Sequence, residues 1–256
     1  MSARAVSLSH VGRASGEGWC VFTRGATRGE CILTPAGSLG MAGVQFADMN
    51  SGTIAEADGA APALRMFVER LRARGLPGIL AVLSTAADEV APVAAELDLT
   101  AGPLVPLMCV RAADARRVEH DYSVWRVDDQ AGVDDAAAVL ADAFDISQEW
   151  VRGMYGPDFA HLPGADVFAA GRHGQAAAVV GTARLGTTVG VYAVGTRQAH
   201  RRRGAASAAM SAAMDHHVSG GAHLFVVLSE PDAEPLYKSL GFAPVDHPSV
   251  WVVPGP

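Results

Sequence analysis

The sequence predicts an α+β protein in which helices flank a mixed, mostly antiparallel sheet. Short β-prone runs alternate with amphipathic helix patterns, and this alternation indicates the fold class. Hydrophobic residues make up 50% of the chain against 18% charged residues, which indicates compact cores. A chain of 256 residues can form two ordinary domains or one large one. We therefore expect α/β layers around compact cores, with little disorder.

In the first half, strand patterns and one-sided helix patterns follow one another. The predicted strands are 19–23, 31–33, 44–46, 79–83 and 104–110, and the predicted helices are 63–74 and 88–97. The first helix is the clearest, because Leu64, Phe67 and Leu71 recur at helical spacing and Gly75 can end it.

The segment 112–121 is charged and has no apolar periodicity, so we expect it to link two domains, 1–116 and 117–256. In the second domain the predicted strands are 122–127, 166–170, 176–184, 188–194, 224–228 and 249–253, and the predicted helices are 133–144, 147–155, 205–218 and a short one between Pro231 and Gly241. Strand 188–195 and strand 223–229 are joined across a helix, so they should run parallel.

The junction between strand 188–194 and the helix after it is the most informative stretch. A turn rich in hydrogen-bonding and cationic residues, 196–203, leads directly into the helix. First-turn amides have no acceptor within the helix, and the helix dipole adds positive potential, so such a junction binds anions. In the spacing Arg201-x-x-Gly204-x-Ala206, the small residues let a diphosphate approach the main chain.

This stretch resembles the acyl-CoA loop of the GNAT superfamily of N-acetyltransferases. A second motif at the right distance, PLYKSLGF at 235–242, is similar to the C-terminal motif of that family. The resemblance implies a GNAT fold, in two tandem copies of which the N-terminal one is degenerate, and acetyl-CoA as the cosubstrate. The residues that it implies for cofactor binding are Val194, Gly195, Thr196, Arg201, Arg202, Arg203, Gly204, Ala205, Ala206 and Ser207.

The same resemblance implies direct transfer of an acetyl group to an amine, with Tyr237 donating a proton to the departing thiolate. Strand 188–195 carries no carboxylate, so Glu230 is the candidate base, although it can equally be the first-turn acid of the next helix. The helix pair 133–155 overhangs the acceptor pocket in the resembled family. The candidate substrate residues are Phe144, Trp150, Tyr155 and Tyr192, for which plain core packing is the alternative. We expect His200, His216 and His217 to be surface residues, with at most one of the last two facing inward.

The first half has no Arg/Gln-x-x-Gly-x-Gly/Ala sequence before a helix and no Tyr-x-x-x-Gly-Phe after one. The order of its elements over 65–110 nevertheless looks like a worn copy of the second half. The alternative is an unrelated α/β domain that covers the substrate side of the catalytic half.

Composition limits the remaining possibilities. A formal charge of −7 argues against nucleic acid as the main partner, and three scattered cysteines indicate neither a disulfide framework nor a zinc site, so we expect no metal. The sequence has no apolar stretch long enough to cross a membrane, so we expect a cytoplasmic protein. The expected partner is a small-molecule amine. A protein or peptide acceptor and a CoA-binding regulatory module without turnover stay open, as does the choice between monomer and homodimer.

Overall fold

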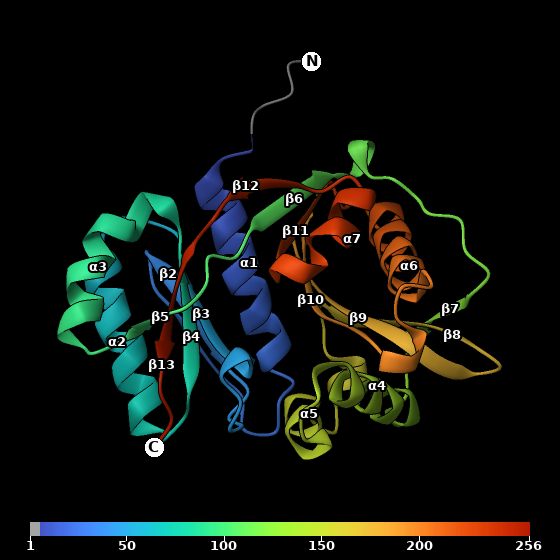
Figure 1. The fold of residues 1–256 in the computed structure, drawn as a ribbon, viewed down its shortest axis with the longest axis horizontal. Helices are drawn as coiled ribbons and strands as arrows, with labels where there is room; N and C mark the ends of the chain where they lie inside the picture. Colours follow the sequence, from blue (N-terminus) through green and yellow to red (C-terminus); the bar gives the residue numbers. More distant parts are fainter. Residues whose placement is uncertain (1–5) are drawn as a thin grey trace.

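The computed structural model describes residues 6–256 and contains two β-sheets with helices around them (Figure 1). The helices are α1 (Leu8–Thr23), α2 (Ala60–Ala73), α3 (Ala87–Glu96), α4 (Gln130–Phe144), α5 (Gln148–Met154), α6 (Ala205–Ser219) and α7 (Glu234–Ser239). The strands are β1 (Glu30–Leu33), β2 (Gly37–Met41), β3 (Asn50–Ile54), β4 (Gly78–Val82), β5 (Thr100–Ala101), β6 (Leu107–Arg111), β7 (Ser123–Val127), β8 (Ala165–Arg172), β9 (Gln175–Leu185), β10 (Thr188–Thr196), β11 (Leu224–Leu228), β12 (Ala243–Asp246) and β13 (Ser249–Val253). The mixed, helix-flanked α+β architecture is as predicted.

Each sheet contains one strand from the other half of the chain. The six-stranded sheet has the order β1-β2-β3-β4-β13-β5, and the seven-stranded sheet has the order β12-β6-β11-β10-β9-β8-β7. Strand β6 therefore lies between β11 and β12, and strand β13 lies between β4 and β5. The predicted boundary at 116/117 does not separate the two sheets. Strand β6 precedes the boundary but joins the sheet of the second half, and β13 follows it but joins the sheet of the first half.

The order of elements repeats along the chain. In the first half, the parallel strands β3 and β4 are joined by α2 and followed by α3 and β5. In the second half, the parallel strands β10 and β11 are joined by α6 and followed by α7 and β12. In both halves the next strand along the chain, β6 or β13, enters the opposite sheet. The predicted parallel pairing of 188–195 with 223–229 is confirmed.

Helix α1 lies between the two sheets and replaces the strand that was predicted at 19–23 (Figure 1). Ser7 caps its start by accepting a hydrogen bond from the His10 amide at 3.2 Å. Glycines let the helix approach both sheets: a Cβ at Gly16 would meet Ser38 and Thr53 of one sheet, and a Cβ at Gly18 would meet Tyr192 of the other. Close packing thus overrides the low helix propensity of glycine, which is the reason the prediction was wrong.

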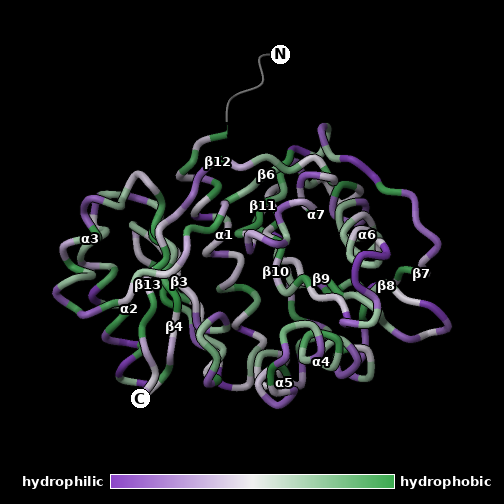
Figure 2. The backbone as a smooth tube through the Cα atoms, viewed as in Figure 1, coloured by the Kyte–Doolittle hydropathy of each residue, from purple (hydrophilic) through white to green (hydrophobic). Residues whose placement is uncertain are grey.

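Elsewhere the predicted elements match the structure to within a few residues, with one further exception. The segment 44–46 forms no strand but leads into a 3-10 turn, η1 (Ala47–Met49). The expected linker lacks regular structure after a 3-10 turn at Ala112–Asp114, and Figure 2 shows this connection from β6 to β7 as mostly hydrophilic. In the described part of the chain, no helix is long and apolar enough to cross a membrane.

Candidate functional site

Strands β10 and β11 separate towards their C-terminal ends. Their parallel pairing runs from Thr188 opposite Leu224 to Gly190 opposite Val226, whereas β10 continues to Thr196. A β-bulge between Tyr192 and Gly195 interrupts the pairing of β10 with β9 on its other side. Ala193 in this bulge has a φ of 47°, so the strand twists sharply there. Beyond Gly190, the edge of β10 on the β11 side has no strand partner in the described chain, so an extended ligand could pair with the main chain there; we call this unpaired edge the slot.

The slot leads to the N-terminus of α6. Gly204 is the N-cap residue of this helix, with a φ of 85°, and no described side chain caps the helix. The first-turn amides of Ala205, Ala206 and Ser207 therefore keep their hydrogen-bonding capacity for a ligand. A Cβ built at Gly204 would have no atom within 4 Å, so the space above the loop is open. A diphosphate fits this cradle in both charge and access.

The predicted phosphate-loop arginines differ in their contacts. The guanidinium of Arg201 donates a hydrogen bond to the Ala143 carbonyl at 2.5 Å, and the Gln198 amide donates one to Asp142 at 2.7 Å. Both contacts fasten the loop to the C-terminal end of α4. Arg202 and Arg203 are exposed. Arg201 thus positions the loop, while its two neighbours can contribute positive charge to a ligand.

Tyr237 lies on α7 with 4% of its surface exposed, and its ring packs edge-on against Phe242 at 5.6 Å between centroids. No hydrogen bond joins its hydroxyl to another residue within 6–256. Burial, and then the negative charge of Glu230, raise the pKa of Tyr237 far above neutrality. The hydroxyl therefore keeps its proton at physiological pH and is free to donate it.

Glu230 directly follows Ser229 at the end of β11 and is exposed. The pKa of Glu230 is raised by its partial burial among surrounding protein atoms, and further by the negative charges of Asp48 and Asp232. The electrostatic coupling to both Tyr237 and Asp48 places Glu230 between the second half and η1 of the first half. A carboxylate with a raised pKa is a better proton acceptor than an ordinary one.

Asp48 was missed in the sequence. It lies in η1, and burial raises its pKa although part of the side chain reaches solvent. Its negative charge also raises the pKa of Glu230, so the two carboxyls lie close enough to interact. No local motif could reveal this contact, because 182 positions separate the two residues along the chain.

The four predicted substrate residues have different surroundings. Phe144 is 47% exposed at the end of α4, and Trp150 stacks on Phe46 of the first half at 6.0 Å. Tyr155 is buried against Phe22 and Phe159, and its hydroxyl has no hydrogen-bond partner among residues 6–256. The structure does not bring these three together around one cavity, and their substrate role stays a prediction.

Tyr192 joins the two halves. Its hydroxyl donates a hydrogen bond to the Ser15 carbonyl of α1 at 2.6 Å, and its ring lies 5.7 Å from that of Trp19. The bond fixes the hydroxyl at the interface, which gives Tyr192 a structural role whether or not it also contacts substrate.

The predicted surface position is wrong for one histidine. His217 is 2% exposed and hydrogen-bonded to Thr182, whereas His216 is exposed. Only one of the pair faces the interior, as expected from their adjacent positions on α6.

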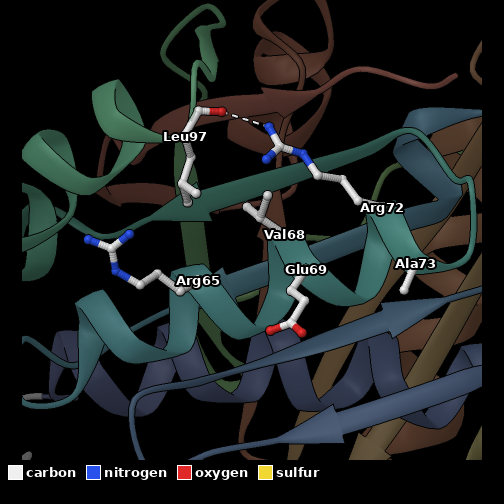
Figure 3. Close-up of a pocket in the computed structure, with 6 residues that line it drawn as sticks. All are labelled: Arg65, Val68, Glu69, Arg72, Ala73 and Leu97. Atoms are coloured by element: carbon white, nitrogen blue, oxygen red, sulfur yellow. Dashed lines mark hydrogen bonds between the residues drawn. The ribbon is translucent and has the colours of Figure 1, made fainter.

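Two surface hollows lie apart from the slot. One, of about 430 Å³, is on the outer side of α2, where Arg72 donates a hydrogen bond to the Leu97 carbonyl at 2.6 Å (Figure 3). The other, of about 620 Å³, borders the phosphate loop and is lined by residues that include Arg172, Arg197 and His200. Neither contains Tyr237 or Glu230.

Comparison with known proteins agrees with the geometry. Residues 135–242 match the model of the acetyltransferase (GNAT) family. No curated protein matches the sequence significantly. Among solved structures, a GCN5-related N-acetyltransferase from Kribbella flavida is similar with a TM-score of 0.69 and 18% identity, over 99% of this chain and 98% of that one.

Two further structures are similar over most of the chain. A GCN5-related N-acetyltransferase from Sphaerobacter thermophilus has a TM-score of 0.57 and 12% identity, covering 85% of this chain and 76% of that one. A tandem GNAT protein from the clavulanic acid biosynthesis pathway has a TM-score of 0.53 and 16% identity, covering 91% and 86%. At these identities the similarity concerns the fold. The phosphate loop, the separating strands β10 and β11, and the C-terminal tyrosine motif all lie within residues 135–242, the segment that matches the acetyltransferase (GNAT) family. Over the rest of the chain, the similarity to GNAT structures is a similarity of fold.

Proposed function

We propose that the protein transfers the acetyl group of acetyl-CoA to a primary amine of a small molecule by direct attack. The observation that carries this proposal is the slot beside β10, which leads into the uncapped N-terminus of α6. An anion cradle next to a strand edge suits a ligand that has a diphosphate at one end and an extended, amide-bearing arm at the other.

In this proposal the amides of 204–207 hold the diphosphate, and the main chain of Val194–Thr196 pairs with the arm. The bound cosubstrate supplies an activated acetyl thioester. Main-chain N–H groups near Val194 and Gly195 stabilise the oxyanion that forms on amine attack. Glu230 accepts the proton of the incoming ammonium, and the Tyr237 hydroxyl donates a proton to the departing sulfur.

The charges near Tyr237 favour a cationic acceptor. Asp48, Glu230 and Asp232 are close enough for their charges to interact, and Lys and Arg are absent from 229–237. Two carboxyls with raised pKa values bind an ammonium group well, because the cation relieves their mutual repulsion. This supports amino acids, amino sugars or other amine-bearing small molecules as acceptors.

We further infer that the first half is a degenerate copy of the second. Gly59 is the N-cap residue of α2 with a φ of 78°, just as Gly204 precedes α6 with a φ of 85°. At the spacing where the second half has Arg201 and Arg203, the first half has Glu56 and Asp58. The shape of the loop is retained while its charge is reversed, so it repels phosphate.

In the described part of the first half, the corresponding strand β3 has no such unpaired edge on the β4 side. Strands β3 and β4 pair up to Ile54 opposite Val82, and the Leu83 amide then donates a hydrogen bond to the Ile54 carbonyl at 2.9 Å. A ligand could pair there only after these hydrogen bonds break. We therefore propose that each chain binds one acetyl-CoA, in its second half.

Release of free CoA thiol from acetyl-CoA, measured with a panel of small amines and peptides, tests the function. We expect small amines to accelerate release by the wild-type chain, and Glu230→Gln to reduce the acceleration. Glu234→Gln is the matched control, because Glu234 is a nearby glutamate that pairs with Lys238 at 2.8 Å.

Two outcomes would contradict the proposal. Acceleration by peptides alone would indicate a protein N-acetyltransferase. Tight CoA binding without release by any amine would indicate a regulatory module.

A further inference from the structure

Three metal-ligating side chains meet at the C-terminal end of α6. Asp166 at the start of β8, and His216 and His217 of α6, each offer one ligand atom, and these atoms lie within 4.8 Å of one another. The phosphate loop is at the other end of the same helix, about 18 Å away at 1.5 Å per residue. The cluster is therefore separate from the acetyl-transfer site, and the proposed reaction does not use it.

The interior half of the cluster is already held in place. His217 is 2% exposed, and its Nε2 lies 2.8 Å from the Thr182 hydroxyl and 3.9 Å from an oxygen of Asp166. Burial lowers the pKa of His217 to about 4; the charge of Asp166 opposes this shift, and those of His216 and Arg184 add to it. The ring is therefore a neutral imidazole at neutral pH, which is the form that binds metal ions.

Within residues 6–256, Asp166 engages one of its two oxygens outside the cluster. Oδ1 accepts a hydrogen bond from Arg126 at 3.0 Å, and Oδ2 is the oxygen that faces His217. Arg184 directs its guanidinium to the carbonyls of Gly186 and Gly220, so it does not occupy this oxygen. The bond to Arg126 orients the carboxylate as outer partners orient ligands in metal sites.

His216 completes the set from the solvent side. It is exposed, and its ring lies 5.2 Å from that of His217 and 5.3 Å from that of Phe168. Two imidazoles and a carboxylate are a donor set typical of zinc and similar divalent ions, with ligand bonds of about 2.0–2.2 Å. Ligand atoms around such an ion are about 3.3 Å apart. The exposed His216 ring can rotate to close the gap, and solvent can fill the remaining position.

We propose that Asp166, His216 and His217 form a binding site for one divalent transition-metal ion of the zinc class, which links the end of α6 to β8. The ion would replace the Thr182 hydroxyl at Nε2 of His217. Thr182 therefore positions the His217 ring when no metal ion is bound, and it does not coordinate the ion when one is bound.

Calorimetric titration of the full chain with Zn²⁺, and visible absorption with Co²⁺, test this proposal. We expect one ion per chain in the wild type, and an affinity lower by about tenfold or more in His216→Ala. His216 is exposed, so this variant should keep the wild-type Tm. His223→Ala, which removes another exposed histidine close by on the chain, should bind like the wild type. Thr182→Val should also retain binding.

The competing account is a purely structural hydrogen-bond network around His217. It predicts that His216→Ala and the wild type bind Zn²⁺ equally, or that His223→Ala weakens binding as much as His216→Ala does. Either result overturns the proposal. Asp166→Asn provides a second check that does not depend on histidine: it should weaken binding while CoA affinity stays unchanged.

Discussion

Replacing Gly204 by alanine tests the phosphate loop with a single added methyl group. Gly204 has a φ of 85°, a region that costs residues with a Cβ about 1–2 kcal/mol. The new Cβ would contact no atom within 4 Å, so this backbone term is the whole expected loss of stability. For a chain of this size we expect the Tm to fall by about 2–8 °C.

The effect on CoA affinity should be larger than this loss implies. The methyl group would stand where the diphosphate approaches the amides of Ala205 and Ala206. Losing one charge-assisted hydrogen bond costs about 1.5–3 kcal/mol, which weakens binding about 10- to 150-fold. Calorimetric titration with CoA measures this change, and thermal denaturation measures the stability term.

Gly186→Ala is the matched control. Gly186 also has a positive φ, 60°, and open space around its Cβ, but it lies in the turn at the other end of β10. It should lose similar stability and keep wild-type affinity for CoA. Equal CoA affinity in Gly204→Ala and Gly186→Ala would refute the placement of the diphosphate.

Three further predictions follow from the same geometry. Tyr237→Phe should lower turnover about 100-fold or more, because it removes the proposed acid. CoA affinity and Tm should stay near wild type, since the hydroxyl makes no hydrogen bond to another residue of 6–256. Tyr122→Phe is the control, and unchanged turnover in Tyr237→Phe would exclude the acid role. Glu230 must be deprotonated to act as a base, and its pKa is raised. The kcat/KM should therefore rise with pH through a midpoint above about 4.3, the pKa of an ordinary glutamate. Glu230→Gln should lower the rate and abolish this rise with pH, and a wild-type rate independent of pH down to 4 would contradict the assignment. Gly16→Ala should lower the free energy of unfolding by about 1–2 kcal/mol, measured in urea, because the added Cβ would overlap Ser38 and lie 2.8 Å from the Thr53 Cβ. This steric cost outweighs the gain in helix propensity. Equal or higher stability would show that α1 can shift between the sheets.

Features that depend on short stretches of sequence were predictable. The loop before α6 follows from the spacing of Arg201, Gly204 and Ala206, and the parallel pairing of β10 with β11 follows from the helix between them. The predicted helix at 147–155 also forms as α5, where Ser147 is the N-cap residue and accepts a hydrogen bond from the Glu149 amide at 3.2 Å.

Features that depend on distant contacts were not predictable. Strands β6 and β13 have ordinary strand patterns, and nothing in a strand pattern says which sheet it joins. Helix α1 contains glycines that count against a helix in isolation, and it is stabilised by contacts on both sides.

In the candidate site, too, the residues with local sequence signals were predictable and the residue from the other half was not. Tyr237 and Glu230 follow locally recognisable elements of the second half. Asp48 comes from the first half and faces the site only because the two sheets lie on either side of α1 (Figure 1).

The most direct test of the account is the stoichiometry of CoA binding to the full chain by calorimetry. We predict saturation at one CoA per chain. The second half has the slot and a basic loop, whereas in the first half the corresponding strands stay paired and the corresponding loop is acidic. An absence of binding would contradict the assignment of the phosphate loop. Saturation at two per chain would contradict the proposed degeneracy of the first half.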